Sequence, residues 1–183
     1  MLLSLLFALA APMQADALQP PTVVVVRHAE KADASRDTDL SAAGYARASA
    51  LDSALIDAPV TAIIVTPFKR NAETAAALAT RHGLTPIVVP LTGGVGAHAK
   101  AVAAEVLRHS GTVLVVGHSN TVGAVVGALG GTATIGDLCE TAFQWMFIVR
   151  PGRDSAQPTM TVRSRYGAAD PPGSDSCGGM SPQ

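Results

Sequence analysis

The sequence predicts an α/β protein with a mostly parallel central sheet. Runs of β-branched and other apolar residues alternate with segments of helical period, and this alternation is typical of parallel α/β folds. The apolar runs are continuous, as expected for strands that are covered on both faces. Of the 183 residues, 48% are hydrophobic and 15% are charged, and the net charge is −1. This composition predicts a globular domain and argues against a disordered chain or a basic surface for nucleic acid.

Six strands are expected. The first follows the pair Pro20-Pro21, and a polar turn over residues 151–158 separates the last two. The predicted strands span residues 22–26, 61–65, 87–89, 112–116, 143–149 and 160–166.

Four helices are expected between these strands. Ser41 is a typical N-cap for the first, which extends to about Leu55, and Gly83 is a typical C-cap for the second, which covers residues 71–81. The third follows a glycine-rich segment, residues 92–96, and the fourth follows the fourth strand. In the first three helices the residues expected to face the core are Ala48, Leu51 and Leu55; Ala72, Ala75, Ala76 and Ala79; and Val102, Ala103, Val106 and Leu107.

Residues 1–17 resemble a secretory signal peptide. The apolar run Leu2–Ala11 is followed by Pro12 and by Ala15-Asp16-Ala17, the small-residue pattern of a cleavage site. The run is too short to cross a bilayer. We therefore expect an exported protein, periplasmic or secreted, with a mature chain that begins at Leu18 and no stable membrane insertion. The alternative is that this run forms a first core element.

Export would place the two cysteines, Cys139 and Cys177, in an oxidising compartment. We expect a disulfide between them that ties the C-terminal segment to the domain, and the alternative is two unrelated thiols. The domain is expected to span residues 18–166. Residues 167–183 are rich in Gly, Pro and Ser, which predicts an irregular tail.

Charged and imidazole side chains follow three of the predicted strands. Arg27 and His28 follow the first strand, Arg70 lies in the first turn after the second, and His118 follows the fourth. Open α/β sheets bind ligands outside the carboxyl ends of their strands, beside helix N-termini that favour anions. Arginine forks match phosphate oxygens, and a neutral imidazole can attack phosphorus. The sequence therefore predicts a phosphate site with a histidine nucleophile at this edge.

These residues lie in motifs that resemble the histidine phosphatase superfamily. The resemblance is to the phosphoglycerate-mutase-like group, in its short, often exported form, and it covers residues 22–121. The motifs are Arg27-His28-Ala29-Glu30-Lys31; Leu40-Ser41-Ala42-Ala43-Gly44; Thr66 with Arg70, Glu73, Thr74 and Ala75; and Val116-Gly117-His118-Ser119-Asn120-Thr121.

The resemblance implies a three-layer α/β/α sandwich and a phosphoric monoester hydrolase that acts on a small phosphorylated substrate without a cofactor. It implies that His28 accepts the phosphoryl group and that Arg27, Arg70 and His118 form the phosphate pocket. The residues expected to add contacts are Thr66, Ser119 and Asn120. No histidine pair has ligand spacing on a helix, so no metal site is expected. The natural substrate and the oligomeric state are not predicted.

The acid that protonates the leaving group is the weakest part of the match. Phosphomutase-like members usually carry a Glu in the loop after the third strand, whereas residues 90–97 contain no acidic residue. Glu30, two residues past the nucleophile, is the best substitute and His98 a weaker one. Glu30 could equally orient Lys31 or an arginine. Without a well-placed acid, good leaving groups such as aryl phosphates or phosphoramidates are favoured.

Two alternative functions differ in how well they fit. Residues 117–121 resemble part of the nucleophile elbow of a serine esterase, but no histidine follows Ser119, as the order of that triad requires. A non-catalytic module that binds an anion or a partner through the same pocket stays open. In such a module, changing His28 would alter binding but no chemistry.

Overall fold

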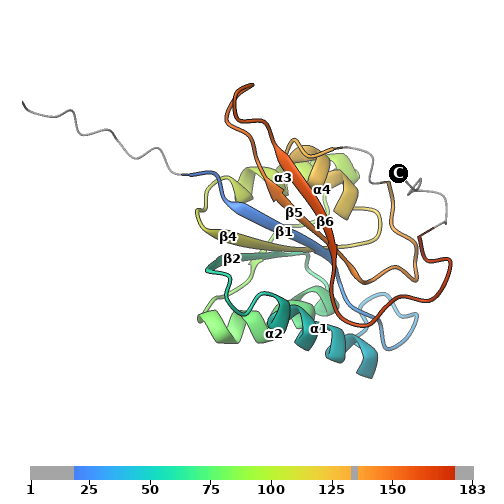
Figure 1. The fold of residues 1–183 in the computed structure, drawn as a ribbon. Helices are drawn as coiled ribbons and strands as arrows, with labels where there is room; N and C mark the ends of the chain where they lie inside the picture. Colours follow the sequence, from blue (N-terminus) through green and yellow to red (C-terminus); the bar gives the residue numbers. More distant parts are fainter. Residues whose placement is uncertain (1–18, 133–135, 176–183) are drawn as a thin grey trace, which may run out of the picture.

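A six-stranded sheet separates two pairs of helices in the computed structural model, which describes residues 19–132 and 136–175 (Figure 1). The strands are β1 (Thr22–Arg27), β2 (Val60–Val65), β3 (Ile87–Val88), β4 (Thr112–Gly117), β5 (Trp145–Arg150) and β6 (Met160–Arg165). The helices are α1 (Ala42–Ala54), α2 (Lys69–His82), α3 (Gly94–Val106) and α4 (Val122–Ala128). The predicted three-layer α/β/α fold is confirmed.

The strand order is β3-β2-β4-β1-β5-β6. The pairs β2–β3, β2–β4 and β1–β4 are parallel, whereas β5 pairs antiparallel with both β1 and β6. The carboxyl ends of the four parallel strands therefore share one edge of the sheet. Strands β1 and β4 are far apart in the sequence but adjacent in the middle of the sheet, so the residues that follow them meet.

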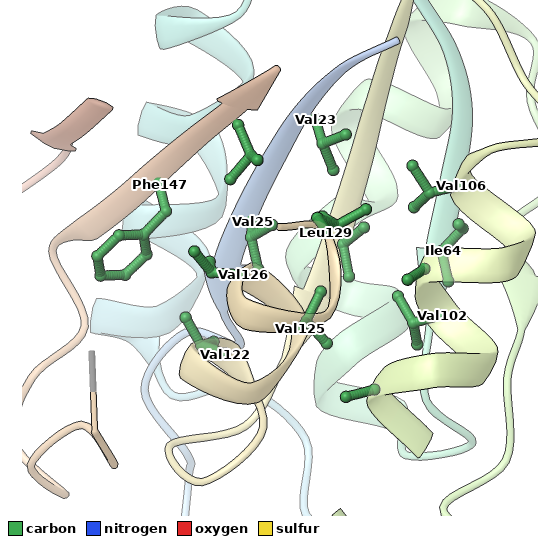
Figure 2. Close-up of a cluster of buried hydrophobic side chains, with 14 of the residues drawn as sticks. Val23, Val25, Ile64, Val102, Val106, Val122, Val125, Val126, Leu129 and Phe147 are labelled. Carbon is green, nitrogen blue, oxygen red and sulfur yellow. The ribbon is translucent and has the colours of Figure 1, made fainter. Parts of the chain in front are cut away.

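Alternate residues of the central strands contribute to two cores. Val23 and Val25 of β1 pack with residues of α3 and α4 such as Val102 and Val125 (Figure 2). The intervening valines of β1 belong to a second core that contains Leu51 of α1 and residues of α2. Fully burying such a side chain stabilises the fold by about 1.5–3 kcal/mol. The continuous apolar runs of the sequence thus result from helices on both faces.

The predicted N-cap of α1 and C-cap of α2 are confirmed, whereas α2 begins at Lys69, two residues before its predicted start. Ser41 is the N-cap of α1, and its Oγ accepts a hydrogen bond from the backbone N–H of Gly44 over 3.1 Å. Gly83 follows α2 with a φ of 62°, in the left-handed region that glycine adopts without strain.

Two of the predicted buried faces are partly wrong. In α2, Ala72 and Ala76 are exposed, whereas Asn71 and Thr74 are buried. The hydrogen bonds of these two polar side chains, described below, explain their burial. Leu107 lies just beyond the end of α3 and is 60% exposed, because the helix ends at the preceding residue.

Residues 167–175 follow β6 and contain no helix or strand. Asp170 in this segment is nevertheless buried against the domain. Residues 1–17 and Cys177 lie outside the described residues, so the signal peptide and the bridge from Cys139 stay predictions. Within the described ranges, no helix combines the length and the hydropathy needed to cross a membrane.

Candidate active site

The register of β1 and β4 brings two histidines together. Arg27 is paired with Gly117, and the backbone N–H of His28 donates to the carbonyl of Gly117 over 2.9 Å. His28 directly follows β1 and His118 directly follows β4, and the centres of their rings are 5.2 Å apart. Strand β2 lies on the other side of β4, which places Thr66 beside His118.

His28 is oriented as a nucleophile. Its Nδ1 lies 2.8 Å from the carbonyl oxygen of Ala29. A carbonyl only accepts hydrogen bonds, so Nδ1 carries the proton and Nε2 keeps its lone pair. Burial of the ring, together with the positive charges of Arg27 and Arg70, lowers the pKa of His28 to about 3 despite the hydrogen bond to Ala29. The imidazole is therefore neutral at physiological pH, as attack on phosphorus requires.

His118 is held between two groups. Its Nε2 is 2.9 Å from Thr66 Oγ1, and its Nδ1 is 3.4 Å from Nη2 of Arg70. Because a guanidinium can only donate, Nδ1 accepts from Arg70 and Nε2–H donates to the hydroxyl of Thr66. Burial and the charge of Arg70 lower the pKa of His118 to about 4, so this ring is also neutral. The permanent positive charge of the site comes from its arginines.

Each of the two arginines packs on an aromatic ring. The guanidinium carbon of Arg27 lies 4.2 Å from the ring centre of Phe143, and that of Arg70 lies 4.4 Å from the ring centre of Phe68. A cation over the face of an aromatic ring is attracted to it, and the stacked plane is held in one orientation. Both forks are thus positioned before any ligand binds.

Arg27 is also anchored by hydrogen bonds. Its Nη1 donates to the carbonyl oxygens of Cys139 and Ala142 over 2.6 and 3.2 Å, and its Nη2 forms a 2.9 Å ion pair with Glu140. The other carboxylate oxygen of Glu140 accepts from the hydroxyl of Ser119 over 2.8 Å. The segment before β5 is therefore fixed to the end of β1 by a single side chain.

Arg27 and Arg70 each keep one donor free. Their Nε atoms are buried and have no hydrogen-bond partner among the residues that the structure describes. Leaving a buried donor unpaired costs about 1–3 kcal/mol, and phosphate oxygens would satisfy both donors. Within residues 19–132 and 136–175, no three His, Cys, Asp or Glu side chains are grouped to hold a metal ion. The free donors suit an anion.

The two histidines and the two arginines line one cavity of about 770 Å³. We call the four buried arginine and histidine residues of its lining, Arg27, His28, Arg70 and His118, the floor. We call four of its exposed lining residues, Lys31, Leu91, Val95 and Glu140, the rim. Ser119 and Asn120 also line the cavity.

Buried polar residues of α2 fix the strand ends. Thr74 Oγ1 accepts the backbone N–H of Ala29 over 2.9 Å and donates to the carbonyl of Arg70 over 2.6 Å. Asn71 Nδ2 donates to the carbonyl of Val116 over 2.9 Å. These bonds link the first turns of α2 to the ends of β1 and β4, so the positions of both histidines depend on α2.

The turn after β4 requires a glycine. Thr121 Oγ1 accepts the backbone N–H of His118 over 2.8 Å. A Cβ atom at Gly117 would lie 2.8 Å from this same oxygen, closer than real Cβ contacts allow. Only glycine permits the tight turn that presents His118 to the cavity.

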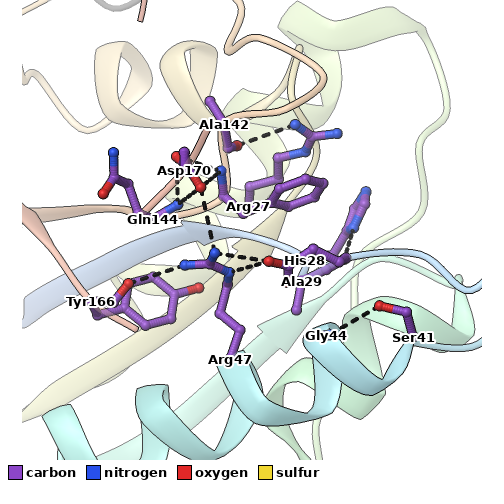
Figure 3. A network of polar contacts seen from close by, with 12 residues as sticks. Arg27, His28, Ala29, Ser41, Gly44, Arg47, Ala142, Gln144, Tyr166 and Asp170 are labelled. Atoms are coloured by element: carbon purple, nitrogen blue, oxygen red, sulfur yellow. Dashed lines mark hydrogen bonds and ion pairs between the residues drawn. The ribbon is translucent and has the colours of Figure 1, made fainter. Parts of the chain in front are cut away.

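A buried arginine supports the site from below (Figure 3). Arg47 of α1 forms a 2.8 Å ion pair with Glu30 and a 3.4 Å ion pair with Asp170, and it donates to the carbonyl of Tyr166. Asp170 in turn accepts the backbone N–H of Phe143 over 3.0 Å. This network connects the loop after His28 to the segment that carries the aromatic partner of Arg27.

Residues 23–91 match the family model described as "Histidine phosphatase superfamily (branch 1)". This range contains Arg27 at the end of β1, His28 directly after it and Arg70 in α2. Over these residues the chain is similar to the histidine phosphatase superfamily. No match was found among curated protein sequences.

Solved structures of phosphatases share the fold of this chain. The mycobacterial glucosyl-3-phosphoglycerate phosphatase with VO3 aligns with a TM-score of 0.60 and 16% identity, over 77% of this chain and 96% of that one. The protein histidine phosphatase SixA with tungstate gives 0.57 and 20%, over 79% and 96% of the two chains. A putative phosphohistidine phosphatase SixA from Agrobacterium tumefaciens gives 0.55 and 19%, over 82% and 99%.

The structure groups most of the predicted site residues. The floor brings together the two arginines and two histidines expected from the sequence, and Thr66, Ser119 and Asn120 lie beside them. Neither predicted acid lines the cavity. The carboxylate of Glu30 is paired with Arg47, and buried His98 donates from Nδ1 to the carbonyl of Pro90 over 3.0 Å.

Three residues of the site were not predicted from the sequence. Phe143 packs on Arg27, and the carboxylates of Asp137 and Glu140 line the cavity. All three belong to the connection between α4 and β5, which lies outside residues 23–91, the range that matches the family model. The sequence carried no signal for them, because the pairing of β5 with β1 that brings this connection to the site is a tertiary contact.

Proposed function

We propose that this histidine phosphatase hydrolyses phosphate monoesters through a covalent phosphohistidine at His28. The observation that carries the proposal is a neutral, buried His28 beside two arginines whose Nε donors have no hydrogen-bond partner among the described residues. A lone pair on Nε2 supplies the nucleophile, and the arginine donors match the oxygens of a phosphoryl group. The superfamily match supports phosphatase activity on a phosphorylated substrate.

In the first step, His28 Nε2 attacks phosphorus and the bond to the leaving oxygen breaks. Arg27 and Arg70 stabilise the negative charge on the phosphoryl oxygens, and His118 completes the pocket. Ser119 and Asn120 add hydrogen bonds at the entrance, while Thr66 holds His118 in its tautomer. In the second step, water attacks the phosphohistidine, the P–N bond breaks, and His28 is restored with inorganic phosphate as product.

Structures of neighbouring phosphatases in complex with oxyanions support the proposal that this cavity binds a phosphoryl group. Two of the structural neighbours were solved with VO3 and with tungstate, oxyanions that resemble phosphate. One neighbour acts on glucosyl-3-phosphoglycerate and another on protein phosphohistidine, according to their names. The cavity of this chain combines cationic, apolar and acidic lining residues, and screening should therefore include sugar phosphates, lipopolysaccharide phosphates and phosphoproteins.

The test compares residues 18–183 with the His28→Asn variant on an aryl phosphate between about pH 4 and pH 8. Loss of the nucleophile should lower turnover by at least about 10³-fold. Acid quenching followed by intact-mass measurement should detect a phosphate adduct on the parent and none on the variant. Turnover that survives in His28→Asn would reject the mechanism. Inactivity of both proteins, with stabilisation of the parent by phosphate, would favour the non-catalytic binding module.

We further propose that the protein is exported and that Cys139 pairs with Cys177. The apolar run and the Ala15-Asp16-Ala17 pattern support export, and the oxidising compartment would permit the bridge. Expression of the full chain should give a mature protein that begins at Leu18 in the periplasmic or secreted fraction. Intact mass with and without reductant then tests the bridge, because its reduction to two thiols adds two hydrogen atoms.

A further inference from the structure

The cavity contains a carboxylate that the sequence motifs do not assign. Glu140 lies at the rim, in the connection between α4 and β5, and its side chain is 74% exposed. Its two oxygens contact Nη2 of Arg27 over 2.9 Å and the hydroxyl of Ser119 over 2.8 Å. It therefore contacts Arg27 of the floor and Ser119 of the cavity lining, while most of its side chain faces the opening.

We propose that Glu140 is the general acid–base of the phosphatase reaction, an inference that rests on the function proposed above. The nucleophile lies at the floor, and displacement at phosphorus is in line, so the leaving oxygen points toward the rim. Glu140 is at that rim. The same position meets the water of the second step, because this water enters on the side that the leaving group vacates.

The other acids fit this position less well. Glu30 is held by buried Arg47 and does not line the cavity, and the loop after β3 contains no acidic residue. Asp137 also lines the cavity, but among the described residues its carboxylate forms no ion pair or hydrogen bond with a floor residue, whereas Glu140 forms an ion pair with Arg27. Among the described residues, Glu140 is therefore the carboxylate best connected to the reacting groups.

Binding of substrate changes the surroundings of Glu140. In the free protein, burial raises the pKa of Glu140, but the hydrogen bond from Ser119 and the charge of Arg27 outweigh it, so the pKa is lowered. A phosphoryl group that binds the free Nε of Arg27 offsets the charge of this cation and places an anion beside the carboxylate. Both changes raise the pKa of Glu140, and the carboxylate accepts the proton of a monoanionic phosphate ester.

The two steps then balance. Protonated Glu140 gives its proton to the leaving oxygen as His28 Nε2 bonds to phosphorus, which yields an alcohol, a phosphohistidine and a carboxylate. The carboxylate next takes a proton from water while the water oxygen bonds to phosphorus and the P–N bond breaks. Inorganic phosphate leaves, neutral His28 is restored, and Glu140 is protonated again.

The test measures Glu140→Gln on an aryl phosphate and on an alkyl phosphate. An alkoxide is a poor leaving group, so kcat/KM for the alkyl phosphate should fall by about 10²–10⁴-fold, whereas kcat/KM for the aryl phosphate should stay within a few-fold. Hydrolysis of the phosphohistidine should also slow. The variant should therefore release a burst of phenol and accumulate a phosphate adduct detectable by intact mass.

Three further variants make the result specific. Glu105→Gln, on the outer part of α3, is the control for a carboxylate outside the cavity. Asp137→Asn and Glu30→Gln test the competing acids, and a loss confined to the alkyl phosphate in either of them, with none in Glu140→Gln, would overturn the proposal. Equal losses on both substrates and no adduct in Glu140→Gln would also overturn it, although His28 would still be the nucleophile. Activity in His28→Asn would instead reject the phosphohistidine mechanism itself.

Discussion

The floor and the rim of the cavity differ in how their side chains are held. Each floor residue is buried and contacts at least one group fixed by the sheet or by α2, as His28 does with the Ala29 carbonyl and His118 with Thr66. The rim residues are exposed, and Leu91 and Val95 sit at 37% exposure. The groups that would bind phosphate are therefore preorganised by the fold, whereas the groups that would meet the rest of a substrate are carried by loops and helix ends.

This contrast predicts how changes in the two regions act. A preorganised donor contributes most where charge develops, so its removal should affect every substrate alike. An exposed side chain contributes only where a substrate reaches it, so its removal should affect some substrates and not others.

The largest effect after loss of the nucleophile is expected for Arg70→Ala. This change removes a free guanidinium donor and the partner of His118 Nδ1, and kcat/KM should fall by about 10²–10³-fold on all phosphate esters. Arg70→Lys is the matched control, since it keeps a positive charge but not the fork. A loss limited to large substrates would show that Arg70 behaves as part of the rim.

The buried histidines predict a pH-dependent stability. The pKa values of His28 and His118 are about 3 and about 4 in the folded protein, below the value of about 6.5 expected for an unfolded chain. The unfolded state therefore binds more protons as the pH falls below about 6.5, and the free energy of unfolding should decrease until the folded pKa values are reached. Denaturant titrations at several pH values measure this decrease. His118→Asn should flatten the curve, and an unchanged slope would contradict the assignment.

A smaller loss is expected for Thr66→Val. The substitution keeps the shape of the side chain but removes the acceptor for His118 Nε2–H, worth about 0.5–1.5 kcal/mol or a factor of up to about ten in kcat/KM. Thr66→Ser restores the hydroxyl and should recover most of the activity. If Thr66→Val stays fully active while Thr66→Ser is impaired, the methyl group and not the hydrogen bond holds His118.

The smallest and most selective effect is expected at the rim. Leu91→Ala removes a half-exposed apolar contact, worth about 1 kcal/mol or less, so kcat/KM for bulky phosphate esters should fall by up to about fivefold. The rate with a small aryl phosphate should not change. Equal losses on small and bulky substrates would remove the distinction between floor and rim.

The fold was largely predictable because its signals are local. Continuous β-branched runs predicted the central strands, and Ser41 and Gly83 predicted the ends of two helices. The predicted buried face of α2 was wrong because contacts between this helix and the strand ends, and not the pattern of apolar residues, decide which side chains are buried. In α2, alanines at the predicted stripe are exposed because Asn71 and Thr74 occupy the buried face and bond to the strand ends.

The site was predictable only where residues follow strands. Parallel strand ends share one edge, so Arg27, His28 and His118 could be grouped without a structure. Glu140 and Phe143 could not, because they follow no strand of the parallel part and are placed by their contacts with Arg27. Glu30 shows the opposite case, since its closeness to His28 in the chain does not bring its carboxylate into the cavity.

The bond between Arg47 and Asp170 has a consequence for biosynthesis. Asp170 comes after every helix and strand in the chain, yet it binds the backbone of Phe143, whose ring packs on Arg27. During translation the sheet and all four helices emerge before Asp170, so the wall of the cavity at Phe143 is the last part to acquire its native contacts. A nascent chain that ends before Asp170 would contain His28, but its Arg27 would be incompletely anchored. The phosphate pocket would therefore be complete only after the rest of the domain has been synthesised.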